Sequence, residues 1–261
     1  MKLGMPTLVE YARLEENLEL CRRLDLEFVE INMNLPVCNP EVTGYAELLR
    51  LKQEYGVELT VHLPEELDLG SIHGAMRQGH VQRCKEAIDW ASGAEIGILN
   101  LHLNSGVYFT LPDRKIWIYE AHQETFLANL AASYAELYPY AREKGVLICI
   151  ENACNFHLPF IREALDRLAA FPEFALTWDV GHDAKTGFAE GPVIAGYPDR
   201  LKHMHLHDFD GKQDHARLYT GQVPVENRLR LAEQKGIGVV VEVKTSQALE
   251  DSIRSVRTNF H

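Results

Sequence analysis

Several motifs that mark common enzyme classes are missing from this chain of 261 residues. It contains neither GxGxxG nor GxxxxGK[ST], the glycine-rich loops that hold nucleotide phosphates, and no GxSxG turn that would present a serine nucleophile. These absences remove nucleotide-dependent transfer and serine hydrolysis from the leading hypotheses about its function.

Cysteine pairs and long apolar runs are missing as well. None of the five cysteines belongs to a CxxC pair, and an odd number cannot all pair within one chain. Reduced thiols are the simplest interpretation. No stretch approaches the roughly 20 apolar residues of a membrane span, and Glu10 and Arg13 interrupt the place where a signal peptide would need its apolar core. We therefore expect a cytoplasmic protein without membrane contact.

Basic residues are outnumbered: 26 Lys and Arg face 38 Asp and Glu, a net charge of −12 with histidine neutral. An acidic surface repels nucleic-acid phosphates, so nucleic acid is an unlikely partner. Gly/Ser-rich linkers and low-complexity tracts are missing too, and the length matches the roughly 250 residues of a complete α/β barrel. We expect one domain spanning residues 1–261.

Short apolar runs rich in β-branched residues alternate with segments of helical spacing. The eight candidate strands are Lys2–Met5, Glu27–Met33, Glu58–Leu63, Ile98–Leu103, Val146–Asn152, Ala175–Val180, Lys202–His207 and Gly238–Val243. Leu130, Tyr134, Leu137 and Ala141 form a helical stripe that Pro139 is expected to kink or shorten. Repeated strand–helix units predict a parallel sheet closed into a (β/α)8 TIM barrel, an α/β fold.

Six of these strands end in a residue able to bind a metal or transfer a proton. These residues are His62, His102, Glu151, Asp179 with His182, His205 and Glu242. Active sites of TIM barrels form at the carboxyl ends of the strands, so residues far apart in sequence should converge there. A single such residue is most often a hydrogen-bonded loop partner, but six strands repeating the pattern are hard to explain in that way.

Several carboxylates meeting in one barrel mouth would repel one another unless a cation neutralised them. The histidines add neutral nitrogen ligands. A mixed His, Asp and Glu set suits Zn²⁺, Mn²⁺, Co²⁺ or Fe²⁺ better than Ca²⁺. The residues themselves thus predict a divalent-metal site at the mouth.

The stretches "IEN", "WDVGH", "HLHD" and "VEVK", in this order and spacing, resemble the xylose isomerase-like TIM barrel superfamily. That group includes sugar isomerases, ketose 3-epimerases, inosose dehydratases and endonuclease IV. The resemblance covers nearly the whole chain. It implies a shared divalent-metal site (Mn²⁺, Zn²⁺, Co²⁺ or Mg²⁺) that falls on Glu151, Asp179, His205 and Glu242.

The same resemblance implies the chemistry. In the epimerases, one glutamate removes a proton from the substrate carbon while a second returns it on the opposite face, through a metal-stabilised enediolate. Carried over, Glu151 and Glu242 are the catalytic acid/base pair. Our leading hypothesis is a metal-dependent isomerase or epimerase of a small sugar, sugar phosphate or polyol. Association into a homo-oligomer is common in the group, but no residue here identifies an interface.

The alternative hypothesis is an endonuclease IV-like phosphoesterase with two or three metals. That resemblance assigns His62, His102, His182 and His215 to further metal sites, whereas in a sugar enzyme the same histidines would contact substrate. The aspartate expected two residues before His215 is replaced by Gln213. The adjacent Asp214 could substitute only if the loop were shifted.

The remaining polar residues near the strand ends have less defined roles. Lys244 could hold a substrate phosphate or carboxylate, or pair with a ligand carboxylate. Within the long polar loop 208–225, Asp208 is expected to anchor the backbone. His203 is expected to be structural, and Glu30 to line the barrel without chemistry.

Overall fold

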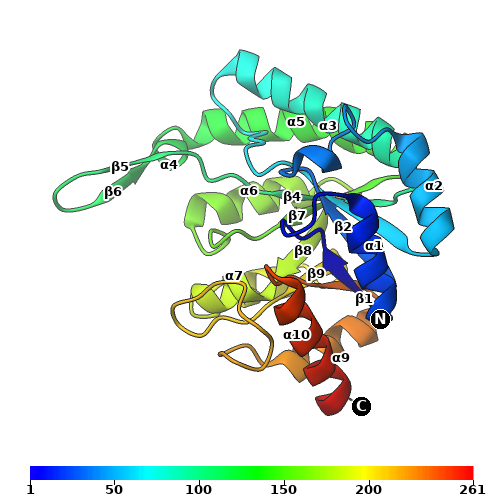
Figure 1. Cartoon of the computed structure of the whole chain (residues 1–261). Coiled ribbons are helices and arrows are strands. Elements are labelled where there is room, and N and C mark those ends of the chain that lie inside the picture. Colours follow the sequence, from blue (N-terminus) through cyan, green and yellow to red (C-terminus); the bar gives the residue numbers. More distant parts are fainter. Residues whose placement is uncertain (261) are drawn as a thin grey trace.

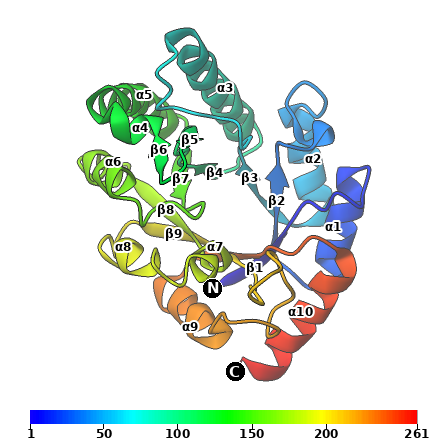
Figure 2. The same ribbon diagram turned by 90° about the vertical axis from the view of Figure 1, so that its left-hand side faces the viewer.

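The computed structural model describes residues 1–260 and shows a closed eight-stranded parallel barrel ringed by helices (Figures 1 and 2). Around the barrel the strands follow the order β1-β10-β9-β8-β7-β4-β3-β2. Their bounds are β1 Lys2–Pro6, β2 Phe28–Asn32, β3 Glu58–His62, β4 Ile98–His102, β7 Leu147–Glu151, β8 Ala175–Asp179, β9 Leu201–Leu206 and β10 Gly238–Val241. The TIM barrel predicted from the sequence is therefore confirmed.

Helices between the strands cover the outside of the barrel, as Figure 2 shows along its axis. They are α1 Leu14–Arg23, α2 Tyr45–Tyr55, α3 Gly74–Gly93, α4 Ile118–Ala121, α5 Gln123–Glu143, α6 Pro159–Ala169, α7 Val180–Lys185, α8 Gly191–Ala195, α9 Val225–Lys235 and α10 Ser246–Asn259, with a short 3-10 turn η1 Pro36–Cys38. Each long helix turns an apolar stripe inward. In α1 the buried stripe includes Leu14, Leu18 and Cys21, as the sequence spacing predicted.

Of the two effects expected of Pro139, a kink or a shortened helix, the shortening does not occur. Helix α5 is not shortened at Pro139 but runs on to Glu143 with the proline inside it. A proline removes one backbone donor and its ring crowds the preceding turn. Buried Leu137, Tyr138 and Ala141 flank it and anchor this stretch of helix in the core, and this packing outweighs the loss.

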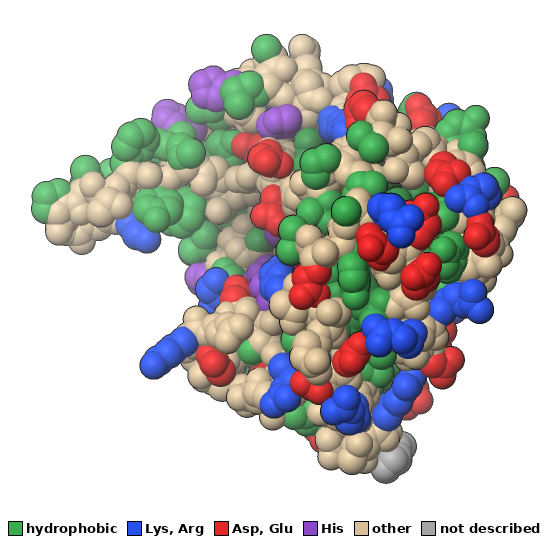
Figure 3. Space-filling model, in the orientation of Figure 1, with side chains coloured by type: hydrophobic (Ala, Val, Ile, Leu, Met, Phe, Trp, Pro, Cys, Tyr) green, Lys and Arg blue, Asp and Glu red, His purple; other side chains and the backbone are tan. Residues whose placement is uncertain are grey.

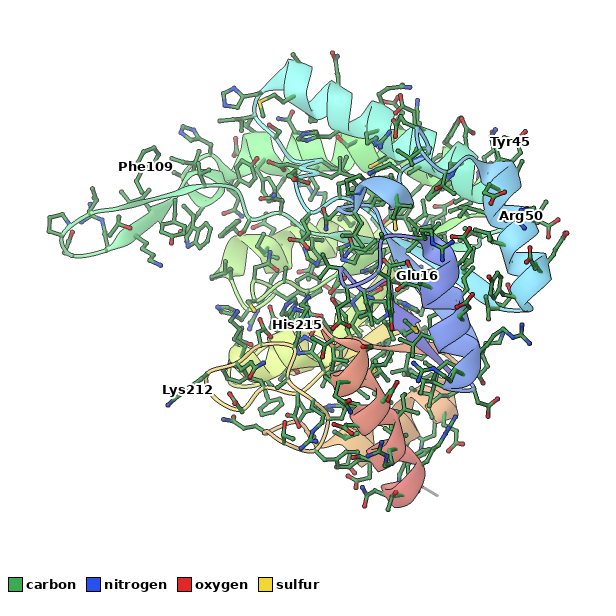
Figure 4. The ribbon with its side chains drawn as sticks, in the orientation of Figure 1. Glu16, Tyr45, Arg50, Phe109, Lys212 and His215 are labelled. Carbon is green, nitrogen blue, oxygen red and sulfur yellow. The ribbon has the colours of Figure 1, made fainter. Side chains whose placement is uncertain are left out.

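The segment between β4 and β7 forms an antiparallel hairpin of β5 (Tyr108–Thr110) with β6 (Lys115–Trp117), two strands that are not among the eight predicted from the sequence. This hairpin projects from the body as an arm (Figure 1). The rings of Tyr108 and Trp117 contact each other at a tilt of 59° with centroids 4.8 Å apart, while Phe109, which is 59% exposed, points away from the barrel (Figure 4).

Among residues 1–260, no helix is both long enough and apolar enough to cross a membrane.

Candidate metal centre and active site

Four strand-end residues form the centre of the barrel mouth. Glu151 closes β7, Asp179 closes β8, His205 lies in β9, and Glu242 directly follows β10. Register brings them together, because Asp179 pairs with His205 and His205 pairs with Val240 on the other side. Each of the four offers a donor atom within 4.8 Å of the others. The structure thus brings the predicted ligand set into one cluster.

The geometry of this cluster centres on one nitrogen of His205. Its Nδ1 lies 3.1 Å from Glu151 Oε1 and 3.0 Å from Glu242 Oε2. The two glutamates reach this nitrogen from strands separated by β8 and β9 in the barrel. A group held next to His205 Nδ1 would therefore have the carboxylate of Glu151 on one side and that of Glu242 on another.

The cluster is buried and strongly charged. Glu151 and Asp179 are almost fully buried, and the Glu242 side chain is 14% exposed. Burial by itself raises the pKa of Glu151, but the neighbouring His205 and His102 outweigh it and hold that pKa well below its usual range. Burial lowers the pKa of His205, yet Glu151, Glu30 and Glu242 together raise it well above its usual range.

These residues fit a divalent cation. Three carboxylates lie close to the imidazole of His205, and without a metal their repulsion is offset by protonated neighbouring histidines, among them His205 with the proton that it shares with Glu151 and Glu242. A divalent ion can replace that proton and satisfy all four donors at once. The carboxylate oxygens of Glu and Asp and the imidazole nitrogen of His suit Mn²⁺, Co²⁺ or Zn²⁺.

Asp179 is held in place by its neighbours. Its side chain accepts the backbone N–H of His182 at 2.7 Å, which caps α7, and His207 Nε2 lies 3.1 Å from its Oδ1. The ring of His207 packs so closely over Gly181 that any Cβ there would lie 2.0 Å from it. The glycine in "WDVGH" therefore leaves space for the histidine that orients Asp179.

His62 and His102 flank Glu151 on its other side. His62 Nε2 lies 3.4 Å from Glu151 Oε2, and His102 Nε2 lies 3.5 Å from Glu151 Oε1. The side-chain amide of Asn100 also donates to Glu151. The structure places both predicted histidines beside the centre, where they can orient Glu151, contact a substrate or bind another cation.

A second group of donors adjoins Asp179 and comprises His182, His207, Asp214 and His215. His182 Nε2 lies 3.9 Å from Asp214 Oδ2, and the rings of His182 and His215 are 5.7 Å apart. Asp214 thus lies beside His182 and His215, for which the resemblance expected an aspartate at the position of Gln213. Lys185, whose Nζ lies 2.9 Å from Asp214 Oδ2, neutralises part of that charge.

The loop that carries Asp214 and His215 is tied to the barrel by Asp208, as the sequence predicted. The Asp208 carboxylate accepts four backbone N–H groups, from Phe209 at 2.9 Å, Thr220 at 3.0 Å, Gly221 at 2.8 Å and Val223 at 3.0 Å. This holds both ends of the loop at the mouth. His215 points toward the centre of the molecule whereas Lys212 points outward from the loop (Figure 4).

A small cavity of about 110 Å³ opens beside Glu242. It is lined by Pro6, Thr7, Leu8, Val9, Asn32, Leu35, Glu242, Val243 and Lys244. Lys244 is 63% exposed, and its Nζ lies 3.8 Å from Glu242 Oε1. The structure therefore places Lys244 at the rim of the site rather than inside it. The mouth is recessed between the hairpin arm and the body below it (Figure 3).

The sequence did not predict that Glu30 contacts the histidines of this site. The prediction placed it in the barrel wall without chemistry, but it lies against His203 and His205 at the base of the cluster. The signal was present: an acidic residue in the middle of the apolar run "FVEIN" is rarely buried unless it is paired.

Comparisons with known proteins bear on the family and the fold of the chain. A sequence profile of the family described as "Xylose isomerase-like TIM barrel" matches residues 18–259. The chain is 27% identical over 202 residues to the fructoselysine 3-epimerase of Shigella flexneri. That alignment spans 73% of this chain and 66% of the relative's length.

Solved structures share the whole fold. A D-tagatose 3-epimerase-like protein superposes with a TM-score of 0.81 at 21% identity, covering 99% of this chain and 96% of that one. The 3-keto-D-glucoside 4-epimerase of E. coli superposes with a TM-score of 0.79 at 15% identity, covering 99% of each chain. At these identities the likeness extends to the fold.

Proposed function

Since the chain belongs to the xylose isomerase-like TIM barrel family, we propose that it is a divalent-metal-dependent epimerase that inverts a carbon next to the carbonyl of a ketose or ketose conjugate. The observation that supports this most directly is the placement of Glu151 and Glu242 on two sides of His205 Nδ1. The names of the relatives, which are 3-epimerases and a 4-epimerase of keto sugars, point the same way.

In this proposal the two glutamates exchange one proton with the substrate carbon. Both carboxylates are ionised, as their lowered pKa values indicate, because His205 outweighs the effect of burial at Glu242 and, with His102, at Glu151. One carboxylate accepts the proton from one face of the carbon, the other takes up a proton from solvent and delivers it to the opposite face, and the first then releases its proton to solvent. General acid–base catalysis of this kind contributes roughly 10²–10⁴-fold.

The metal ligands would be Glu151, Asp179, His205 and Glu242. A divalent cation there would polarise the substrate carbonyl and stabilise the negative charge developing on its oxygen. His207 keeps Asp179 oriented. His62 and His102 would keep Glu151 oriented and contact the sugar hydroxyls.

Solvent isotope exchange tests this proposal. Mn²⁺-loaded protein is incubated in D₂O with D-tagatose, D-psicose, D-fructose and fructoselysine, and the products are examined by NMR. The expected result is epimerisation of at least one ketose with deuterium entering at the inverted carbon, and loss of both on adding EDTA. Epimer formation without any deuterium, or in the presence of EDTA, would contradict proton transfer at a metal-dependent site.

A phosphoesterase of the endonuclease IV kind is the second candidate. The observation that favours it is the presence of further donor groups on both sides of the shared site, His62 with His102 and His182 with Asp214 and His215. Pairs of metals suit the hydrolysis of phosphate esters. Two or three tightly bound ions per chain together with nicking of abasic-site DNA would support it. One ion and no nicking would exclude it.

A further inference from the structure

A buried carboxylate outside the four-residue ligand group lies directly beneath it. Glu30, in the middle of β2, is only 2% exposed. Its Oε1 lies 2.7 Å from His205 Nε2, and its Oε2 lies 3.0 Å from both His203 Nε2 and the hydroxyl of Thr60. Glu30 thus touches the only histidine of the ligand group on the side away from the other ligands.

Burying a carboxylate costs several kcal/mol unless partners compensate for it. Glu30 has three such partners: His203 and His205 from β9, and Thr60 from the neighbouring strand β3. The Thr60 hydroxyl donates to one oxygen of this carboxylate, and imidazole nitrogens of His203 and His205 lie against its two oxygens, so Glu30 is placed to accept hydrogen bonds.

This has a consequence for the imidazole of His205. A neutral imidazole carries a proton on one nitrogen and a free lone pair on the other, and the hydrogen bond at one nitrogen decides the state of its partner. The Glu30 carboxylate oxygen 2.7 Å from Nε2 favours a proton on that nitrogen. The lone pair is then on Nδ1, the nitrogen that lies between Glu151 and Glu242.

We infer that Glu30 is a positioning residue: it fixes the ring orientation and tautomer of His205 so that Nδ1 can bind the metal. His203 and Thr60 in turn hold the second oxygen of Glu30. His203 comes from the same strand as His205, two residues earlier, and so faces the barrel interior with it. This inference rests on the proposed function only in that His205 binds a metal.

The competing role for Glu30 is direct ligation. Glu30, His203 and His205 also bring donor atoms within 4.8 Å of one another. In that arrangement Nε2 of His205 would bind the metal, and Glu151 and Glu242 would not be metal ligands. The two roles predict losses of metal affinity of different size when the carboxylate is removed.

The test measures Co²⁺ and Mn²⁺ affinity of the full chain by competition with a chelating dye. In the same samples it records the visible absorption of bound Co²⁺ and the Tm of the metal-free protein. Positioning predicts that Glu30→Gln weakens metal binding roughly 10- to 100-fold and changes the Co²⁺ band. Thr60→Val, which keeps the carboxylate but removes one of its donors, should show a smaller loss of metal affinity with only a small fall in Tm. Glu58→Gln, an exposed glutamate on the same strand as Thr60, is the matched control and should bind like wild type.

Wild-type affinity and an unaltered Co²⁺ band in both Glu30→Gln and Thr60→Val would overturn the inference. A loss in Glu30→Gln as large as that in Glu151→Gln would overturn it as well, in favour of direct ligation. If Glu30→Gln does not fold, Thr60→Val decides. Failure of wild type to bind either metal would refute the proposed function itself, and is distinguishable from these results.

Discussion

At the scale of single residues, the chemistry depends on carboxylates that the fold keeps ionised in a buried place. Glu151 and Glu242 remain charged because His205 lies between them. In the proposed mechanism the same contacts serve two purposes, since they form the metal site and place a proton acceptor on each of two sides of it. A neutral isostere should therefore affect both metal binding and turnover.

Glu242→Gln is expected to abolish detectable epimerisation and to weaken metal binding. The amide keeps the size of the side chain but can neither accept the substrate proton nor supply negative charge, and loss of acid–base help alone costs roughly 10²–10⁴-fold in kcat. Turnover and Mn²⁺ affinity are measured on the same preparations. Glu233→Gln, an exposed glutamate on α9, is the control and should match wild type. Full activity in Glu242→Gln would refute the mechanism.

At the scale of elements, each strand delivers a side chain to the mouth and each following loop secures it. The loop after β9 is the clearest example, because one carboxylate, Asp208, satisfies backbone donors at both of its ends. Asp214 and His215 reach the second donor group only through this loop. Its conformation therefore controls one wall of the site.

Asp208→Asn should loosen that loop. An asparagine has one acceptor oxygen instead of two and turns an NH₂ group toward backbone donors, so about 1–3 kcal/mol of stability is expected to be lost. Amide hydrogen exchange of residues 209–223 should become faster, and the KM for the ketose should increase. Asp210→Asn is the matched control, because Asp210 accepts only from Lys212 and Gln213 at the exposed tip. Unchanged exchange in Asp208→Asn would show that the loop has another anchor.

At the scale of the whole molecule, the charged groups at the barrel mouth are expected to couple metal binding to pH. Burial lowers the pKa of His62 and His207, but their carboxylate neighbours, chiefly Glu151 for His62 and Asp179 for His207, outweigh this and raise each to about 9. A histidine whose pKa is raised in the folded state contributes to the stability of the metal-free protein. That contribution is fully present below about pH 6.5, the usual pKa of histidine, and it is lost as the pH rises through about 9.

The metal-free protein should therefore have a Tm that falls between about pH 6.5 and 9. Metal binding should strengthen as the pH rises, because His205, whose pKa is raised by its carboxylate neighbours, must lose a proton to bind. Differential scanning fluorimetry with EDTA and with Mn²⁺ should thus show a difference in Tm that grows with pH. His62→Gln should flatten the metal-free curve. A metal-free Tm that is constant or rises to pH 9 would contradict this assignment of charges.

The sequence by itself determined the barrel and the position of its mouth. Alternating apolar runs and helical stripes predicted every barrel strand to within two residues at either end, because local hydrophobic periodicity and strand-end chemistry are written along the chain. It also predicted that Glu151, Asp179, His205 and Glu242 would converge, since parallel strands end at one face.

Only the tertiary structure decided which side chains support these ligands. Glu30 and His205 are far apart in sequence, and their contact exists because barrel closure brings β2 opposite β9. The approach of Asp214 to His182 depends on a loop conformation in which His215 adopts a positive φ of 51°. Helix α5 likewise continues through Pro139 because tertiary packing outweighs a local preference. Strand pairing across the barrel, loop conformation and core packing are non-local, so no pattern along the chain could specify them.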